Sequence, residues 1–267
     1  MDPPLNVAEW KILADAVRGT SHQGNGKPCQ DAFRTISCGP CESILVVALS
    51  DGAGSANFAD VGATLTCDSL IGSIISRIEK LPTASQFTRQ VFLEVFTDAR
   101  IELIRETERR GCSLRELACT ALLAVMSPDA AAFAQLGDGA IVIARGDRYE
   151  PVFWPQEGEY ANETNFLTED DFANALEAVV VDEPIYELAA FSDGLQRLAL
   201  DYTSRSGHLG FFRPLFQRLQ TEENLEQLLA PFRQFLDSAR INARTDDDKT
   251  LVLATRTVTN ELTTENR

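Results

Sequence analysis

The sequence predicts an α+β fold in which antiparallel sheets carry helices on their outer faces. Strand-like segments occupy the beginning and the second half of the chain, and two long helical patterns lie together between them. This order does not alternate strand with helix, as a doubly wound parallel sheet would require. With 267 residues and 44% hydrophobic side chains, the chain can bury a large core, and no linker divides it. We therefore expect residues 1–267 to form a single domain.

The first three strands are predicted from an alternating pattern and from a turn. Trp10, Ile12, Ala14 and Ala16 alternate with more polar neighbours, which is typical of a half-buried strand. The segments DAFRTIS and ESILVVALS then flank a Gly-Pro turn, which indicates an antiparallel pair. The same turn spells Cys-Gly-Pro-Cys, but a strand follows it instead of the helix that a thioredoxin-like redox motif needs. We interpret it as a hairpin.

Two helices are predicted next, because apolar residues recur every three or four positions. Residues 60–81 place Leu70, Ile74 and Ile78 on one stripe, and residues 86–110 repeat the pattern up to Gly111, a C-terminal cap.

Strands return in the second half of the chain. They are predicted in CTALLAVMS, AAFAQL, AIVIARG, YELAAFS and KTLVLATRT. Between them we expect a short helix opened by Thr168, with Asp171 three residues later as a variant capping box, and a longer helix over residues 224–239. The aromatic residues of FFRPLFQRL are interpreted as core packing.

Charge and composition limit the partners. The chain has 24 Lys and Arg against 40 Asp and Glu, a formal charge of −16, which repels the phosphates of nucleic acids and anionic lipids. We expect no nucleic-acid or membrane partner. The amino terminus does not resemble a signal peptide, and no apolar run is long enough to span a membrane. A cytoplasmic protein with reduced cysteines is therefore expected.

Aspartates stand where predicted strands begin or end, and this pattern carries the functional prediction. They are Asp31 at the start of a strand, Asp51 and Asp193 at the ends of strands, Asp138 in the turn LGDGA, and Asp247 before the last strand. A carboxylate at a strand end has a fixed direction at the rim of the core. Several such ends on one rim would make a metal site.

The residue types favour hard cations. Mg²⁺ and Mn²⁺ take oxygen ligands, and the chain has only two histidines, which disfavours zinc. Gly52 and Gly194, which follow two of the acids, allow the backbone to approach a ligand closely. Each acid taken alone also fits an ordinary role, since Asp-Gly is a common turn, LGDGA fits a hairpin, and the run of three aspartates at 246–248 fits a solvated loop.

Taken together, the motifs resemble the metal-dependent serine/threonine phosphatases of type 2C, in particular a small stand-alone bacterial branch. The matching segments are CQDA, SDGAGS, GDG, GEYAN, SDGLQRLAL and RTDDDKTL, in order, across residues 19–255. The resemblance implies a four-layer α/β/β/α sandwich, with two antiparallel sheets face to face, helices outside, and a metal site in the cleft at one edge.

The resemblance also implies the ligands. Asp51 would bridge two Mg²⁺ or Mn²⁺ ions, with the Gly52 carbonyl on one of them. Asp193 and Asp247 would hold the other ion, so that Asp51, Asp193 and Asp247 carry the catalysis. Asp31 would act through bound water, and Asp138 with Asp193 matches a weaker third metal position.

The sequence departs from the family pattern at three positions near this site. Gln30 stands where many members have Glu, and Ala53 stands where animal enzymes have a His proposed to protonate the leaving group. Their phosphate-binding Arg has no clear match. His22 and Lys27 lie in the equivalent turn and are candidates for substrate binding.

A variable flap beside the cleft is implied at about residues 154–170. Its length is typical of functional loops, and Tyr160 and Asn162 are its candidates for substrate contact.

The leading hypothesis is a phosphatase that hydrolyses phosphoserine and phosphothreonine on proteins through a water activated by two metals. A phosphorylated protein is its substrate, a serine/threonine kinase is a possible partner, and a monomer is expected. The alternative is a catalytically weak relative that binds phosphoprotein or a partner kinase as a scaffold. A calcium module is disfavoured, because the acid spacing of an EF-hand is absent.

Overall fold

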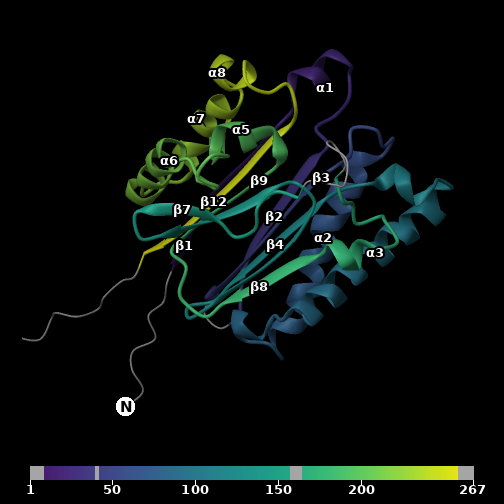
Figure 1. Cartoon of the computed structure of the whole chain (residues 1–267), viewed down its shortest axis with the longest axis horizontal. Coiled ribbons are helices and arrows are strands. Elements are labelled where there is room, and N and C mark those ends of the chain that lie inside the picture. Colours follow the sequence, from purple (N-terminus) through teal and green to yellow (C-terminus); the bar gives the residue numbers. More distant parts are fainter. Residues whose placement is uncertain (1–8, 40–41, 157–163, 258–267) are drawn as a thin grey trace, which may run out of the picture.

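Two antiparallel sheets form the centre of the computed structural model, which describes residues 9–39, 42–156 and 164–257 (Figure 1). The seven-stranded sheet contains, in spatial order, β1 (Glu9–Val17), β12 (Lys249–Thr257), β9 (Glu187–Phe191), β6 (Ala140–Arg145), β7 (Arg148–Pro151), β11 (Ser206–Gly207) and β10 (Leu200–Asp201). The five-stranded sheet contains β2 (Asp31–Cys38), β3 (Ile44–Asp51), β4 (Ala121–Met126), β5 (Ala131–Leu136) and β8 (Glu177–Val181).

Helices cover the outer face of each sheet. The helices are α1 (Thr20–Gly24), α2 (Ala59–Ile78), α3 (Arg89–Arg110), α4 (Phe172–Ala175), α5 (Gln196–Ala199), α6 (Leu209–Thr221), α7 (Glu226–Leu236) and α8 (Ala239–Asn242). Among the described residues, the 3₁₀ turn η2 (Ala84–Gln86) lies between α2 and α3, η3 (Leu114–Leu117) lies between α3 and β4, and η4 (Asp193–Leu195) lies between β9 and α5. In Figure 1, α2 and α3 lie against the five-stranded sheet, and α6, α7 and α8 lie on the opposite side of the molecule.

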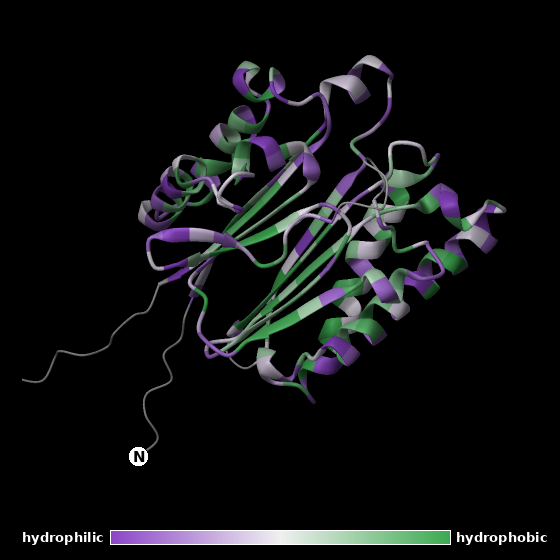
Figure 2. Cartoon of the chain, in the orientation of Figure 1, coloured by the Kyte–Doolittle hydropathy of each residue, from purple (hydrophilic) through white to green (hydrophobic). Residues whose placement is uncertain are grey.

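Three apolar layers hold this arrangement together. Buried residues of α2 and α3 pack on the five-stranded sheet, and those of α6 and α7 pack on the seven-stranded sheet. A third cluster fills the space between the sheets. Alternate residues of β1 serve two layers, because Trp10 joins the cluster between the sheets and Leu13 joins the outer one. Figure 2 shows apolar residues concentrated along the strands and polar ones on the outer turns of the helices.

The predicted α+β sandwich of two antiparallel sheets with outer helices is confirmed. The two long helices lie where the spacing predicted them, and Gly111 ends α3 with a φ of 68° in the left-handed region that glycine adopts without strain. The hairpin of β2 and β3 is confirmed by the pairing of Cys38 with Ile44. That residues 1–267 make one domain stays a prediction.

Two local predictions and one alternative reading need correction, and one helix was not predicted. The turn at Asp138 is no hairpin, because β5 and β6 belong to different sheets and the chain crosses between them there. The short helix begins after Asp171 and not at Thr168, which lies in the preceding turn. The helix predicted over 224–239 ends at Leu236, and α8 follows separately. Helix α6, which contains Pro214, was not predicted at all.

Within the described residues, no helix combines the length and the apolar character that crossing a lipid bilayer requires.

Candidate metal centre

The predicted acids come from strand ends of both sheets. In the five-stranded sheet, Asp31 at the start of β2 lies directly opposite Asp51 at the end of β3. In the other sheet, Asp193 follows β9 and Asp247 precedes β12, and these two strands are paired. Each pair of acids therefore lies at one edge of its own sheet. Whether the two pairs meet depends on how the two edges are joined.

Asp31 joins the two edges. The hydroxyl of Ser192 donates to Asp31 Oδ2 at 2.7 Å, and the hydroxyl of Thr250 donates to the same oxygen at 2.8 Å. Both hydroxyls belong to the seven-stranded side, and the Thr250 N–H donates to Ser192 Oγ at 3.0 Å. One carboxylate oxygen of Asp31 is thereby fixed, while Oδ1 is buried without a hydrogen-bond partner in the part of the chain that the structure describes.

The five predicted acids form one connected electrostatic network, in which each acid acts on at least one other. The side chains of Asp51 and Asp193 are hydrogen-bonded neighbours, and the charges of Asp31 and Asp138 also act on Asp51. The charges of Asp138 and Asp247 act on Asp193. The structure therefore brings together acids of which the first, Asp31, and the last, Asp247, are more than 200 residues apart in the sequence.

Burial is the main reason why these carboxyls hold protons unusually tightly. It raises the pKa of Asp31 to about 7, opposed by the Ser192 hydroxyl and reinforced by the charge of Asp248. Burial and then the charges of Asp138 and Asp247 raise the pKa of Asp193 to about 6. Burial and the neighbouring carboxylates raise the pKa of Asp51 well above its ordinary value.

This donor set fits divalent cations. Asp193 Oδ1, like Asp31 Oδ1, is buried without a partner in the described part of the chain. Buried acceptors without donors cost free energy, and crowded carboxylates repel one another. The nearby ammonium of Lys249 binds the side-chain oxygen of Asn242 at 2.8 Å. Oxygen ligands without nitrogen or sulfur partners suit Mg²⁺ or Mn²⁺.

Two glycines allow the backbone to close around the acids. A Cβ on Gly52 would lie 2.5 Å from the Ala59 carbonyl oxygen, and a Cβ on Gly194 would lie 2.0 Å from the Asp248 carbonyl oxygen. No side chain fits at these distances. The Gly52 N–H donates to the Gln30 carbonyl at 3.1 Å, which ties the end of β3 to the residue before Asp31.

Asp138 is held by the segments on either side of it in space. Thr164 donates its hydroxyl to Asp138 Oδ2 at 2.7 Å, and the Gln196 amide donates to the Asp138 carbonyl. The Gly137 N–H donates to Gln156 Oε1 at 2.8 Å. Gln156 and Thr164 are the described residues nearest to the middle of the predicted flap, so both of its ends contact the Asp138 turn. Residues 157–163, which include the predicted contacts Tyr160 and Asn162, lie outside the described residues.

The two candidates in the amino-terminal turn differ in position. The Lys27 ammonium donates to the Gly54 carbonyl at 2.8 Å, which places a positive charge against the loop that follows Asp51. His22 is only 9% exposed, and its Nδ1 lies 2.9 Å from Asp248 Oδ2. Ala53 is equally buried and packs against Ala59 and other alanines, so no titratable group stands at that position.

Asp248 is the residue that sequence reasoning missed. It is 2% exposed, and its two oxygens accept the N–H of Gly19 at 2.6 Å and the N–H of Gln30 at 2.5 Å. His22, Asp247 and Asp248 offer ligand atoms within 4.8 Å of one another. Since both Asp248 oxygens already accept backbone hydrogens, we assign Asp248 to positioning the loop and not to a further ion site. The local sequence does not distinguish the buried Asp248 from its neighbours Asp246 and Asp247.

Comparison with known proteins agrees with this architecture. A sequence model described as Protein phosphatase 2C matches residues 18–233. Serine/threonine-protein phosphatase 3 of Escherichia coli strain K12 is 35% identical over 251 residues, which cover 92% of this chain and 98% of that protein. Both matches are to protein phosphatases. The chain belongs to the protein phosphatase 2C family.

Solved structures show the same fold at low sequence identity. The serine/threonine phosphatase Stp1 from Staphylococcus aureus superposes with a TM-score of 0.62 at 15% identity, covering 92% of this chain and 95% of that one. The catalytic domain of the phosphatase PstP, solved in complex with two manganese ions, superposes with a TM-score of 0.60 at 14% identity, covering 92% and 98%.

Proposed function

We propose that this chain is a metal-dependent phosphatase that hydrolyses phosphoserine and phosphothreonine on proteins. The observation that carries the proposal is the cluster of Asp31, Asp51 and Asp193 at the joined edges of the two sheets, in which two buried carboxylate oxygens lack a donor among the described residues. Family membership and the 35% identical serine/threonine phosphatase support the same reaction.

Within this proposal, the acids divide the work of holding two ions. Asp51 and the Gly52 carbonyl would share one ion, and Asp51, Asp193 and Asp247 would hold the second. Asp31 would act through water. Asp138 with Asp193 would form a weaker third position. When bound, Mg²⁺ or Mn²⁺ supplies positive charge for the phosphoryl oxygens and makes water a better nucleophile near neutral pH.

The chain's own residues would orient the acids and the substrate. The Ser192 and Thr250 hydroxyls fix the direction of Asp31, so that Oδ1 stays available for water. Lys27 would attract the phosphate, because its ammonium lies against the loop after Asp51. His22, Tyr160 and Asn162 stay predictions for substrate contact. The buried Ala53 has no proton to give to the leaving group.

The test is release of phosphate from a phosphothreonine peptide, measured with and without Mn²⁺. Activity should require the metal and should fall by at least about 100-fold in Asp51→Asn and Asp193→Asn, since each removes a charged ligand. A rise in melting temperature with Mn²⁺ reports metal binding separately. Metal binding without turnover would favour the phosphoprotein-binding scaffold. Full activity in EDTA would contradict the proposal.

We further propose that a serine/threonine kinase makes the substrates, that the enzyme works as a monomer, and that it acts in the cytoplasm. The five described cysteines are free thiols, which is usual in a reducing compartment.

A further inference from the structure

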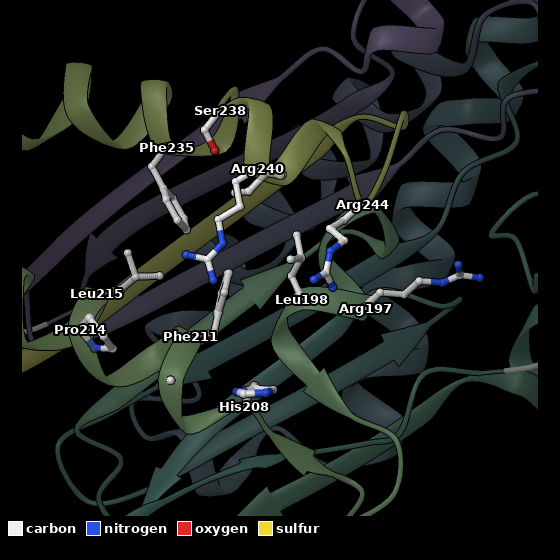
Figure 3. A pocket seen from close by; sticks show the side chains of 12 residues that line it. Arg197, Leu198, His208, Phe211, Pro214, Leu215, Phe235, Ser238, Arg240 and Arg244 are labelled. Atoms are coloured by element: carbon white, nitrogen blue, oxygen red, sulfur yellow. The ribbon is translucent and has the colours of Figure 1, made fainter.

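A second concave site lies on the helical side of the seven-stranded sheet. It is a cavity of about 500 Å³ bordered by α5, α6, the end of α7 and α8 (Figure 3). Its floor is apolar and consists of Leu198, Phe211, Leu215 and Phe235, which are half-buried residues of α5, α6 and α7 that pack against the outer core. This volume is in the range of ligand pockets and admits side chains or a short segment, not a folded domain.

Three arginines border the cavity, and they distinguish it from the rest of the surface. Arg197, Arg240 and Arg244 are exposed, and none has an ion-pair or hydrogen-bond partner in the described part of the chain. Figure 3 shows Arg240 and Arg244 reaching over the apolar floor. Arginines elsewhere on the same helices are paired, such as Arg218 with Glu222 and Arg233 with Asp15. We call this site, formed by the three arginines and the four floor residues, the arginine groove.

The charge of the whole protein makes this cluster unusual. A chain with a formal charge of −16 has acids to spare for pairing, yet Arg197, Arg240 and Arg244 border one cavity without an acidic partner in the described residues. Unpaired guanidinium groups beside apolar surface suit a partner that carries carboxylates next to a bulky apolar side chain, because arginine forms forked hydrogen bonds with carboxylates. Aromatic and arginine residues are also enriched among the anchors of protein interfaces.

We propose that the arginine groove binds an acidic segment of the protein substrate, with a bulky apolar side chain on the groove floor and carboxylates on the arginines. The proposal rests on the proposed phosphatase function, since it names the substrate as the occupant. The enzyme would accordingly prefer protein substrates that carry acidic and bulky apolar residues near the phosphorylated residue.

The connection to the acid cluster argues for the substrate as the occupant. Arg197 follows Asp193 by four residues, and Arg244 precedes Asp247 by three. At a maximum of about 3.8 Å between successive Cα atoms, the Cα atoms of these arginines lie within roughly 15 Å and 11 Å of the Cα atoms of the two acids. An extended peptide spans about 3.3 Å per residue, so a stretch of about five residues reaches from a phosphate at the acids to the groove. One phosphoprotein chain can therefore occupy both places.

Direct binding is tested with a fluorescein-labelled, unphosphorylated peptide of about ten residues that alternates glutamate with leucine and phenylalanine. Its fluorescence anisotropy is measured on the full chain, with EDTA and with Mn²⁺. Removing two exposed arginine partners in Arg240→Ala/Arg244→Ala should weaken binding roughly 5- to 20-fold. The matched control Arg148→Ala removes an exposed arginine that lies outside the groove and should change binding less than about 2-fold. A peptide with glutamine in place of glutamate should bind as weakly to the wild type as the acidic peptide binds to the double variant.

Equal binding of the acidic peptide to the wild type and the double variant would overturn the proposal. Displacement of the peptide by ATP or citrate at concentrations similar to the peptide's own affinity would also overturn it, because it would indicate a site for small anions. Concentration-dependent dimers that the double variant abolishes would place a second copy of the chain in the groove and overturn it as well.

Hydrolysis identifies the occupant. A phosphothreonine peptide with an acidic and apolar extension is compared with the same peptide cut short, using kcat/KM. The extension should raise kcat/KM of the wild type about 5-fold or more, and the double variant should lose this gain while hydrolysing p-nitrophenyl phosphate normally. An extension effect that is equal in both proteins overturns the proposal. If the wild type with Mn²⁺ fails to hydrolyse p-nitrophenyl phosphate, the phosphatase function fails, whereas the anisotropy still decides whether the groove binds the acidic segment.

Discussion

Replacing Asp248 should show how much the buried carboxylate between the two halves of the cleft stabilises the protein. Asp248 accepts the backbone N–H groups of Gly19 and Gln30, which lie 229 and 218 residues away in the sequence. It therefore ties the start of α1 and the entry to β2 to the beginning of β12. In Asp248→Ala, two buried donors lose their acceptor, and His22 loses its neighbour at 2.9 Å.

The magnitude follows from these contacts. A hydrogen bond to a charged group contributes about 1.5–3 kcal/mol, so two of them account for about 3–6 kcal/mol. Part of this loss is offset, because the charge of Asp248 also raises the pKa of Asp31 through repulsion, and the substitution removes that repulsion. We expect Asp248→Ala to lower the free energy of unfolding by about 3–5 kcal/mol, a large fraction of a typical total. Asp248→Asn keeps one acceptor and should lose about half as much.

The assay is urea unfolding at pH 8 in EDTA, followed by circular dichroism. Asp246→Ala is the matched control, because it removes the same charge from the same loop, and the Asp246 side chain is exposed and makes no hydrogen bond or ion pair in the described structure. Its free energy of unfolding should hardly change. A loss below about 1 kcal/mol in Asp248→Ala would mean that water satisfies the two N–H groups, and the positioning role assigned to Asp248 would be wrong.

Three further outcomes are expected for the acids and for one glycine. In EDTA at pH 8, Asp193→Asn should raise the free energy of unfolding by up to about 3 kcal/mol, because a pKa of about 6 means that the ionised Asp193 carboxylate destabilises the folded state. With Mn²⁺ present, the same variant should lose the stabilisation that the ion gives the wild type. In the metal-free wild type, the pKa values of about 7 for Asp31 and about 6 for Asp193 exceed the ordinary 3.8, so the folded state binds more protons. Stability present in acid should therefore be lost as the pH rises from about 4 to 7, and urea midpoints that are flat or rising between pH 5 and pH 8 would contradict this. Gly194→Ala should lower the free energy of unfolding by about 1–3 kcal/mol, because its Cβ would lie 2.0 Å from the Asp248 carbonyl oxygen. The control Gly72→Ala, with open space around the new Cβ, should leave the melting temperature unchanged or raise it.

Elements with a strong local pattern were predictable from the sequence. The strands that end at Asp51 and begin at Asp31, and helices α2 and α3, follow from periodicity within a single segment. Helix α6 was not predicted whereas α7 was, although each contains an internal proline, Pro231 in α7 and Pro214 in α6. Pro214 is tolerated in α6 because Phe212 and Phe216 are buried in the outer core.

Features that depend on distant partners were not predictable. The turn around Asp138 has the local sequence of a hairpin, but it crosses between sheets because β5 pairs with β8 and β6 pairs with β9. The same limit applies to Asp248, whose burial depends on residues near the other end of the chain. The acids themselves could be proposed from the sequence because they stand at strand ends and turns and because their motifs, taken together, match the phosphatase family in order and spacing.

The joint between the sheets explains why folding and cation binding should be coupled. Asp31 and Asp51 belong to one sheet, Asp193 flanks the other, and the direct bonds across the joint at Asp31 are two hydroxyl hydrogen bonds to a single oxygen. Like charges collected at this joint oppose the closure that those bonds favour. Divalent cations shared between acids of both sheets would reverse the sign of that electrostatic contribution. The same cluster of carboxylates therefore destabilises the contact between the two sheet edges without metal and would stabilise it once cations are bound.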